Sequence, residues 1–206
     1  MAHIQDLLQE ISLLSSASAT LDWDQETYSP DRSVAHRAKQ LAYLQGKIHK
    51  LQTSDEFCEG LASLDPDNQR ELTHRYERAT KLPQKLVERD SETSSLAKAA
   101  WSEAREKNEF QTFAPHLAKL LEIAREKTDH WGFEDEPYDA LLCEYERGAK
   151  TREIATLFDS IDTELAEIAA AAVEKSSVIA ADFLYGPAPI EAQQSLNHEL
   201  AESLGF

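Results

Sequence analysis

The sequence predicts an all-α fold, an elongated array of about eight or nine helices in a single domain over residues 1–206. Apolar residues recur at steps of three and four along most of the chain, the spacing that places them on one face of a helix. Residues that cap or start helices precede several of these periodic segments. Strand patterns are nearly absent, since residues 177–181 alone form a weak, short candidate.

The first two predicted helices have clear apolar faces. The first ends near Trp23, and the second follows the break at residues 28–30 and stops near Thr53. Their apolar faces consist of Ile4, Leu7, Leu8, Ile11, Leu14 and Ala17, and of Val34, Ala38, Leu41, Leu44, Ile48 and Leu51.

Capping signals predict the next three helices. Thr53 and Glu56 have the spacing of a capping box before a short helix. Asp65 followed by Pro66 gives a fourth helix an N-cap and a first-turn proline. Pro83 opens a long fifth helix that continues to about residue 108.

The second half of the chain continues the helical pattern. A sixth helix is predicted from Thr112 to about residue 129, with Pro115 tolerable only in its first turn. Pro137 begins a short helix that runs through Tyr145 and is closed by Gly148. Thr151 is then expected to cap a long helix, and a final helix spans about 190–204. The long helix carries a heptad-like stripe of Ile154, Leu157, Ile161, Leu165 and Ile168.

Charge and cysteine content exclude several classes of protein. The chain has 21 Lys and Arg against 38 Asp and Glu, a net charge of −17, so nucleic acids and anionic membranes are not expected partners. The two cysteines match neither a disulfide framework nor a CxxC motif. The N-terminus lacks the basic region of a signal peptide, and no apolar run is long enough to span a membrane. We expect a cytoplasmic protein.

A zinc hydrolase signature is missing from the sequence. Such enzymes place two histidines and a general-base carboxylate on one helix as His-Glu-x-x-His. The nearest approach is His198 with Glu202, four residues apart and without a third ligand nearby. A solvated histidine in an acidic helix explains this pair better, so we expect no metal ligands.

An acidic cluster follows the first helix. Asp22, Asp24 and Glu26 flank Trp23, and such a cluster can bind a cation or serve acid–base chemistry. The spacing departs from a calcium loop. The alternative is a turn in which Trp23 packs into the core while the acids stay in water.

A second cluster, residues 138–146, combines two tyrosines with three acids on a short helix. This composition suits the wall of a polar groove. Core packing by Leu141, Leu142 and Tyr145 is the alternative, and Cys143 is expected to be a buried small apolar residue rather than a nucleophile.

The order of these segments resembles the thermostable zinc carboxypeptidases of the carboxypeptidase Taq type along essentially the whole chain. The resemblance rests on five stretches in the family's order: residues 21–28, 76–83, 108–110 with 113–117, 137–148, and 186–191 leading to 204–206. Residues 138–148 keep the family's Tyr-Asp-Ala-Leu-Leu-Asp-Glu-Tyr-Glu-Pro-Gly pattern, except that Cys143 and Arg147 replace an acid and a proline.

The resemblance implies a cytoplasmic, all-helical and usually homodimeric metallocarboxypeptidase that uses zinc or cobalt to remove C-terminal residues from peptides. In that family the metal ligands and substrate-carboxylate motifs follow the region matched here, so no catalytic or metal residue can be carried over. Groove-lining roles are expected for Trp23, Asp24, Tyr28, Tyr138, Asp139, Glu144 and Tyr145.

Three hypotheses follow from the sequence. The first is a truncated or stand-alone relative of the enzyme's N-terminal region, inactive by itself, lacking the C-terminal zinc-binding portion and needing no cofactor. The second is one half of a split carboxypeptidase that works with a separate C-terminal half. The third is an acidic helical module that binds peptides or proteins. A homodimer or a C-terminal-half partner is expected, because helices facing a missing portion would leave apolar surface uncovered.

Overall fold

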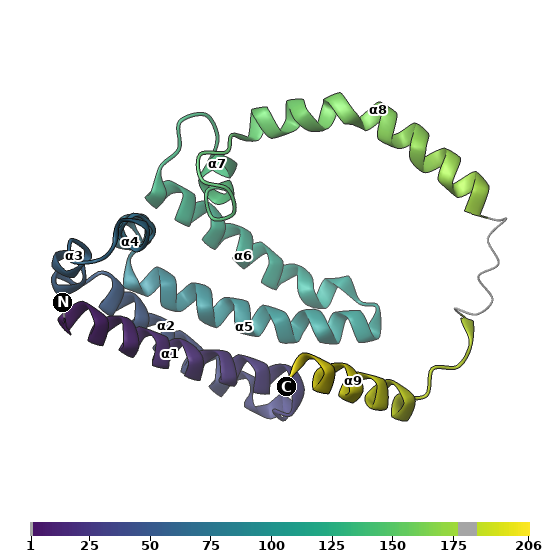
Figure 1. The fold of residues 1–206 in the computed structure, drawn as a ribbon, viewed down its shortest axis with the longest axis horizontal. Coiled ribbons are helices and arrows are strands. Elements are labelled where there is room, and N and C mark those ends of the chain that lie inside the picture. Colours follow the sequence, from purple (N-terminus) through teal and green to yellow (C-terminus); the bar gives the residue numbers. More distant parts are fainter. Residues whose placement is uncertain (1, 177–184) are drawn as a thin grey trace. The chain divides into compact units, whose positions relative to one another are not determined.

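The computed structural model describes residues 2–176 and 185–206, without the side chains of residues 2 and 3. These residues form nine α-helices and one 3-10 turn and contain no strand, which confirms the all-α prediction (Figure 1). The weak strand candidate at residues 177–181 lies outside the described residues. The chain divides into two compact units, Met1–Thr151 and Arg152–Phe206, which are described separately. A single domain over residues 1–206 stays a prediction.

The first helix is longer than predicted. Helix α1 spans Ala2–Thr27, so the acidic cluster lies in its last turns rather than in a loop. The hydroxyl of Thr27 donates to the carbonyl of Trp23 at 2.8 Å. Pro30 ends the helical run because the residue before a proline avoids the helical region. A short 3-10 turn, Asp31–Ser33, leads into α2, Val34–Gln52, whose bounds match the prediction.

Helices α3 and α4 begin with side-chain caps. In α3, Asp55–Leu61, the hydroxyl of Ser54 accepts a hydrogen bond from the backbone of Phe57 at 3.2 Å. The predicted cap at Thr53 is therefore wrong by one residue, since the Thr53 hydroxyl donates back to the carbonyl of His49. Helix α4, Pro66–Lys81, has the predicted cap, because the Asp65 carboxylate accepts from the Asn68 backbone at 3.1 Å.

Helices α5 and α6 form an antiparallel pair joined by a tight turn. Helix α5 spans Gln84–Lys107 and α6 spans Phe110–Trp131. Asn108 makes the turn with a φ of 53°, in the left-handed region that asparagine tolerates. Pro115 lies in the second turn of α6, so the prediction that places it in the first turn is wrong. Because α6 starts two residues before Thr112, Pro115 lies inside the helix. Proline has no backbone N–H, so the helix tolerates one missing hydrogen bond there.

Helix α7, Pro137–Leu142, is shorter than predicted. The backbone N–H of Tyr145 bonds back to the Leu142 carbonyl at 2.9 Å, a turn rather than a continued helix. Gly148 then adopts a φ of 84°, which a side chain would oppose.

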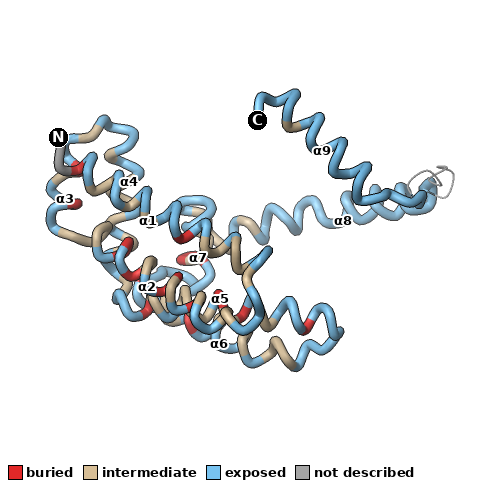
Figure 2. Tube along the Cα trace, turned by 90° about the horizontal axis from the view of Figure 1, so that it is seen from below, coloured by how far each residue is buried: buried red, intermediate tan, exposed pale blue. Residues whose placement is uncertain are grey.

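Within Met1–Thr151, α1 packs against α2, α2 against α5, α5 against α6, and α6 against α7 (Figure 1). Figure 2 shows the buried residues concentrated along these contacts. The central core consists of Ala38, Leu41, Ala42, Ile48, Leu86, Ala97, Ala104, Ile123 and Trp131. A second cluster joins α1 to α3 and α4 and is built on Ile4, Phe57 and Leu61.

The remaining helices are α8, Thr151–Ser176, and α9, Ile190–Leu204, close to the predicted bounds, but Thr151 is the first helical residue of α8 rather than its cap, and its hydroxyl donates to Asp139. Neither contains a buried residue. The predicted apolar stripe on α8 is present but exposed: Leu157, Ile161, Leu165 and Ile168 are 59%, 45%, 58% and 59% accessible. Among the described residues, no helix is long and apolar enough to cross a membrane.

Candidate functional site

The acidic cluster at the end of α1 is neutralised by basic residues of the same fold. The Asp24 carboxylate accepts a hydrogen bond from Arg37 of α2. Lys98 of α5 pairs with Glu26 and lies 3.8 Å from Asp22. Each of the three acids therefore already has a cationic neighbour, which disfavours the hypothesis that this cluster binds a metal ion.

The aromatic residues of this region face solvent. Trp23 is 56% exposed and Tyr28 is 78% exposed, and their rings meet edge to face with centroids 5.5 Å apart. The interpretation in which Trp23 packs into the core is therefore wrong. Two neighbouring exposed rings form an apolar surface suited to contact with a chain or ligand.

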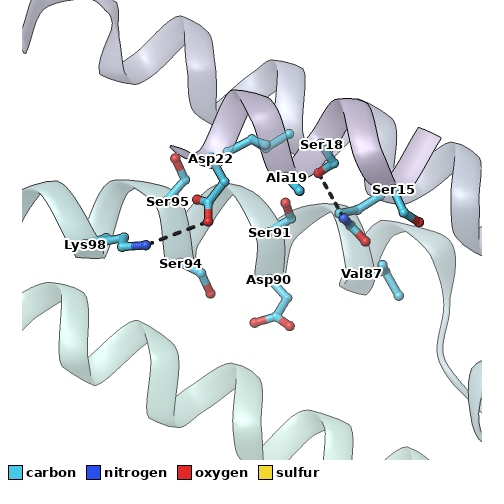
Figure 3. A pocket seen from close by; sticks show the side chains of 12 residues that line it. Ser15, Ser18, Ala19, Asp22, Val87, Asp90, Ser91, Ser94, Ser95 and Lys98 are labelled. Carbon is cyan, nitrogen blue, oxygen red and sulfur yellow. Dashed lines mark hydrogen bonds and ion pairs between the residues drawn. The ribbon is translucent and has the colours of Figure 1, made fainter. Parts of the chain in front are cut away.

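A serine-lined cavity of about 540 Å³ lies between α1, α2 and α5 (Figure 3). Ser91 and Ser95 of α5 lie beside Ala19 and Asp22 of α1 (Figure 3). The buried hydroxyl of Ser95 donates to the Gln25 side chain at 2.8 Å, and this bond joins α1 to α5. Sequence reasoning missed this cavity, although the helical spacing of Ser91 and Ser95 on α5 is a signal for it.

In the second predicted cluster, residues 138–146, some side chains contact other parts of the fold and others face solvent. Tyr138 and Tyr145 are 54% and 93% exposed, so core packing by Tyr145 is wrong. Leu141 and Leu142 are half-buried. Cys143 is half-buried rather than buried, and its sulfur lies 4.0 Å from His74 Nε2.

Arg78 of α4 holds the turn after α7 in place. Its Nε and Nη2 donate to the Glu144 carboxylate at 2.9 and 2.5 Å, and Nη2 also donates to the Ala140 carbonyl at 3.1 Å. The guanidinium stacks on the Trp131 ring at 3.9 Å, and the Trp131 indole N–H donates to the Arg78 carbonyl at 3.3 Å. The Glu144 carboxylate is thus engaged in an ion pair inside the fold.

The Asp139 carboxylate anchors the first residue of α8. It is 8% exposed and accepts hydrogen bonds from the Thr151 backbone N–H at 2.8 Å and from the Thr151 hydroxyl at 2.7 Å. These two bonds, together with Lys150 at 3.6 Å, lower the pKa of Asp139. Thr151 is thus held by an acid twelve residues earlier, a link that the sequence pattern does not reveal.

The two groups of predicted groove residues lie in different parts of the fold. Trp23 and Asp24 lie in the last turns of α1 and Tyr28 follows it, whereas Tyr138, Asp139, Glu144 and Tyr145 belong to α7 and the turn after it. Figure 1 shows α1 and α7 on opposite sides of α5 and α6. A shared groove that contains both groups stays a prediction.

A cavity of about 900 Å³ is lined mainly by α4, together with residues of α2, α5, the end of α6 and the turn after α7. Five of its lining residues are Arg or Lys and three are Asp or Glu, an unusual balance in an acidic chain. Sequence reasoning missed this cavity, because its lining residues come from segments about 70 positions apart.

The described side chains do not fit the zinc site that the family resemblance implies. Within residues 4–176 and 185–206, no three His, Cys, Asp or Glu side chains gather closely enough to hold a metal ion. His198 and Glu202 lie 3.3 Å apart, but both are well exposed. A zinc site needs at least three protein ligands, and this pair supplies two.

Comparison with known proteins identifies relatives along nearly the whole chain. The sequence model for carboxypeptidase Taq (M32) metallopeptidases matches residues 3–206. The chain belongs to this family.

Three carboxypeptidases illustrate the similarity. Thermostable carboxypeptidase 1 of Pyrococcus furiosus is 30% identical over 82% of this chain and 36% of its own length. Carboxypeptidase 1 of Bacillus subtilis is 29% identical over 98% of this chain and 42% of its own length. The crystal structure of BsuCP covers 100% of this chain and 44% of its own, with 27% identity and a TM-score of 0.90. The chain therefore spans less than half the length of these M32 relatives.

Proposed function

We propose that this chain supplies the N-terminal helical part of an M32 metallocarboxypeptidase and does not cleave peptides by itself. The observation that carries this proposal is the match to the family over residues 3–206, which extends over only 36% and 42% of two relatives named carboxypeptidase. The lack of three convergent ligands among the described side chains supports the same proposal. Removal of C-terminal peptide residues then requires a further polypeptide segment that carries the metal.

The exposed stripe on α8 is the surface proposed to contact that segment. Leu157, Ile161, Leu165 and Ile168 share one helical face, and all are between 45% and 59% exposed. Contiguous apolar surface of this kind marks an interaction site. A homodimer through the same stripe is the alternative arrangement, and both arrangements fit a cytoplasmic protein whose Cys58 and Cys143 are free thiols.

The test mixes the purified chain with a metal-binding portion and measures hydrolysis. The chain alone, supplied with zinc or cobalt, is expected to release no C-terminal residue from an N-blocked peptide. Turnover is expected after addition of the part of Bacillus subtilis carboxypeptidase 1 that follows the matched region. Leu165→Glu should abolish complex formation in size-exclusion chromatography with light scattering, whereas Leu13→Glu, at the 65% exposed position on α1, should not. Stoichiometric zinc and turnover in the chain alone would overturn the proposal.

A second function is favoured by the exposed pair of Trp23 and Tyr28. Aromatic rings at a surface are common anchors in protein interfaces. If the chain is a peptide-binding module, Trp23 fluorescence should change saturably with unstructured peptides at micromolar concentration, without cleavage. Trp23→Ala, titrated with a fluorophore-labelled peptide because the variant lacks the reporting ring, should remove this binding, and an unchanged affinity would contradict the second function.

A further inference from the structure

The helix α4 carries a basic surface that the carboxypeptidase proposal does not use. Arg70, His74 and Arg147 line both the 900 Å³ cavity and a neighbouring cavity of about 370 Å³. Arg75 lines the first of these. These four residues are named here the α4 basic cleft, and all belong to the Met1–Thr151 unit.

The cleft has more guanidinium groups than carboxylates to pair with them. Arg75 Nε donates to Glu71 Oε1 at 2.9 Å, and Arg147 Nη2 donates to Glu71 Oε2 at 2.9 Å. One carboxylate is thus shared by two cations. Arg70 approaches only Asp67, at 3.7 Å, and that pair is well exposed. Within the described residues, the other N–H groups of Arg75 and Arg147 make no hydrogen bond.

The pKa of His74 is affected by the same positive charges. Burial lowers the pKa of His74, and the positive charges of Arg147 and Arg78 lower it further, while Glu71 and Glu77 act in the opposite direction. The imidazole is therefore neutral at neutral pH and presents a nitrogen beside the Cys143 thiol. A positive field within a chain of net charge −17 has to come from the local arrangement of residues.

We propose that the α4 basic cleft binds a phosphate group through Arg70, His74 and Arg147. Planar guanidinium groups present paired N–H donors that match the oxygens of a phosphate. A dianion in the cleft would balance the excess of two positive charges among the residues that line the larger cavity. Its oxygens would also accept hydrogen bonds from the N–H groups of Arg75 and Arg147 that do not bind Glu71. This site is independent of the proposed carboxypeptidase role.

The experiment follows the His74 ring signals by NMR while inorganic phosphate is added to the full chain at an ionic strength held constant with sodium chloride. The expected result is a saturable shift and a higher pKa for His74, because an adjacent anion favours the imidazolium. Acetate at the same concentration should bind at least about tenfold more weakly. Phenyl phosphate serves as a second probe, and binding tighter than that of inorganic phosphate would support an organic phosphate ester as the ligand.

Variants distinguish phosphate binding in the cleft from a general effect of the protein's charge. Arg147→Gln should weaken phosphate binding about tenfold or more, the loss expected for one charge-assisted hydrogen-bonding group. Arg147→Lys should weaken it less, because the charge remains but the paired donors are lost. Arg105→Gln removes one exposed charge at the end of α5 and should change the affinity less than about twofold.

The folded state of each variant is checked by circular dichroism before titration, since Arg147 also pairs with Glu71. Three results would overturn the proposal: no saturable shift of His74, equal binding of acetate and phosphate, or equal losses in Arg147→Gln and Arg105→Gln.

Discussion

Replacing Trp131 by alanine tests whether the end of α6 organises the turn after α7. Trp131 is 9% exposed, and its ring lies 3.9 Å beneath the Arg78 guanidinium. Its indole N–H bonds to the Arg78 carbonyl, so the same side chain contacts both the backbone and the charged end of Arg78. Arg78 in turn holds Glu144 and the Ala140 carbonyl.

The magnitude follows from burial and from the contact with Arg78. Truncating a buried Trp to Ala costs about 3–5 kcal/mol. The interaction between a cation and an aromatic ring contributes about 0.5–2 kcal/mol of that total. For a unit of about 150 residues, each kcal/mol lowers Tm by roughly 2–4 °C, so Trp131→Ala should lower Tm by about 10 °C.

Urea unfolding followed by circular dichroism gives the free energy of unfolding for the wild type, for Trp131→Ala and for a control variant. Trp101→Ala is the matched control, because Trp101 is 51% exposed on α5 and should cost no more than about 1 kcal/mol. Losses that agree within 1 kcal/mol for the two tryptophans would refute the reasoning. So would an unchanged Tm for Trp131→Ala.

Two further predictions concern a carboxylate and a glycine. The pKa of Asp139 is lowered by its bonds to Thr151, so its stabilising effect is complete above the unfolded value of 3.8 and is lost as pH falls through the lower folded value. Asp139→Asn should therefore destabilise the chain in urea titrations at pH 7, and this loss should shrink as the pH falls below 3.8; a loss that does not change with pH would contradict this. Gly60→Ala places a Cβ 2.7 Å from Ile4 Cβ and should cost about 1–3 kcal/mol of overpacking, offset by about 1 kcal/mol of helix propensity. Gly46→Ala meets only the Glu88 side chain, so thermal denaturation should show it neutral or stabilising, and the same Tm change for both glycines would argue against the packing explanation.

Helix positions were largely predictable because local rules determine them. Asp65 caps α4 as its sequence spacing predicts, and the bounds of α2, α8 and α9 agree with the apolar periodicity. Errors arose where neighbouring residues satisfy the same rule. Thr53 and Ser54 are both capable caps, and the chain uses Ser54.

Burial was harder to predict than helix position. Apolar periodicity correctly identifies the stripe that contains Leu165 but cannot tell whether another element covers it, and it is exposed. Trp23 was expected in one interpretation to pack into the core from a turn, yet α1 continues past it and places its ring in solvent. Periodicity reports a face of a helix, whereas burial depends on the elements packed against that face.

The charged contacts of the candidate site could not be predicted, since they join distant parts of the sequence. Arg78 and Glu144 are 66 residues apart, and Arg147 and Glu71 are 76 apart. Local sequence rules describe pairs three or four residues apart on one helix. The α4 basic cleft becomes visible only when α4 and the turn after α7 are brought together.

The absence of buried residues in α8 and α9 has a consequence for calorimetry. The heat capacity of unfolding reflects the apolar surface that becomes hydrated, and these helices already present theirs to water. Their melting should therefore add little to the heat-capacity step and little to the denaturant m-value, which will report mainly on Met1–Thr151. Backbone amides in α8 and α9 should also exchange with deuterium sooner than those of α2 and α5.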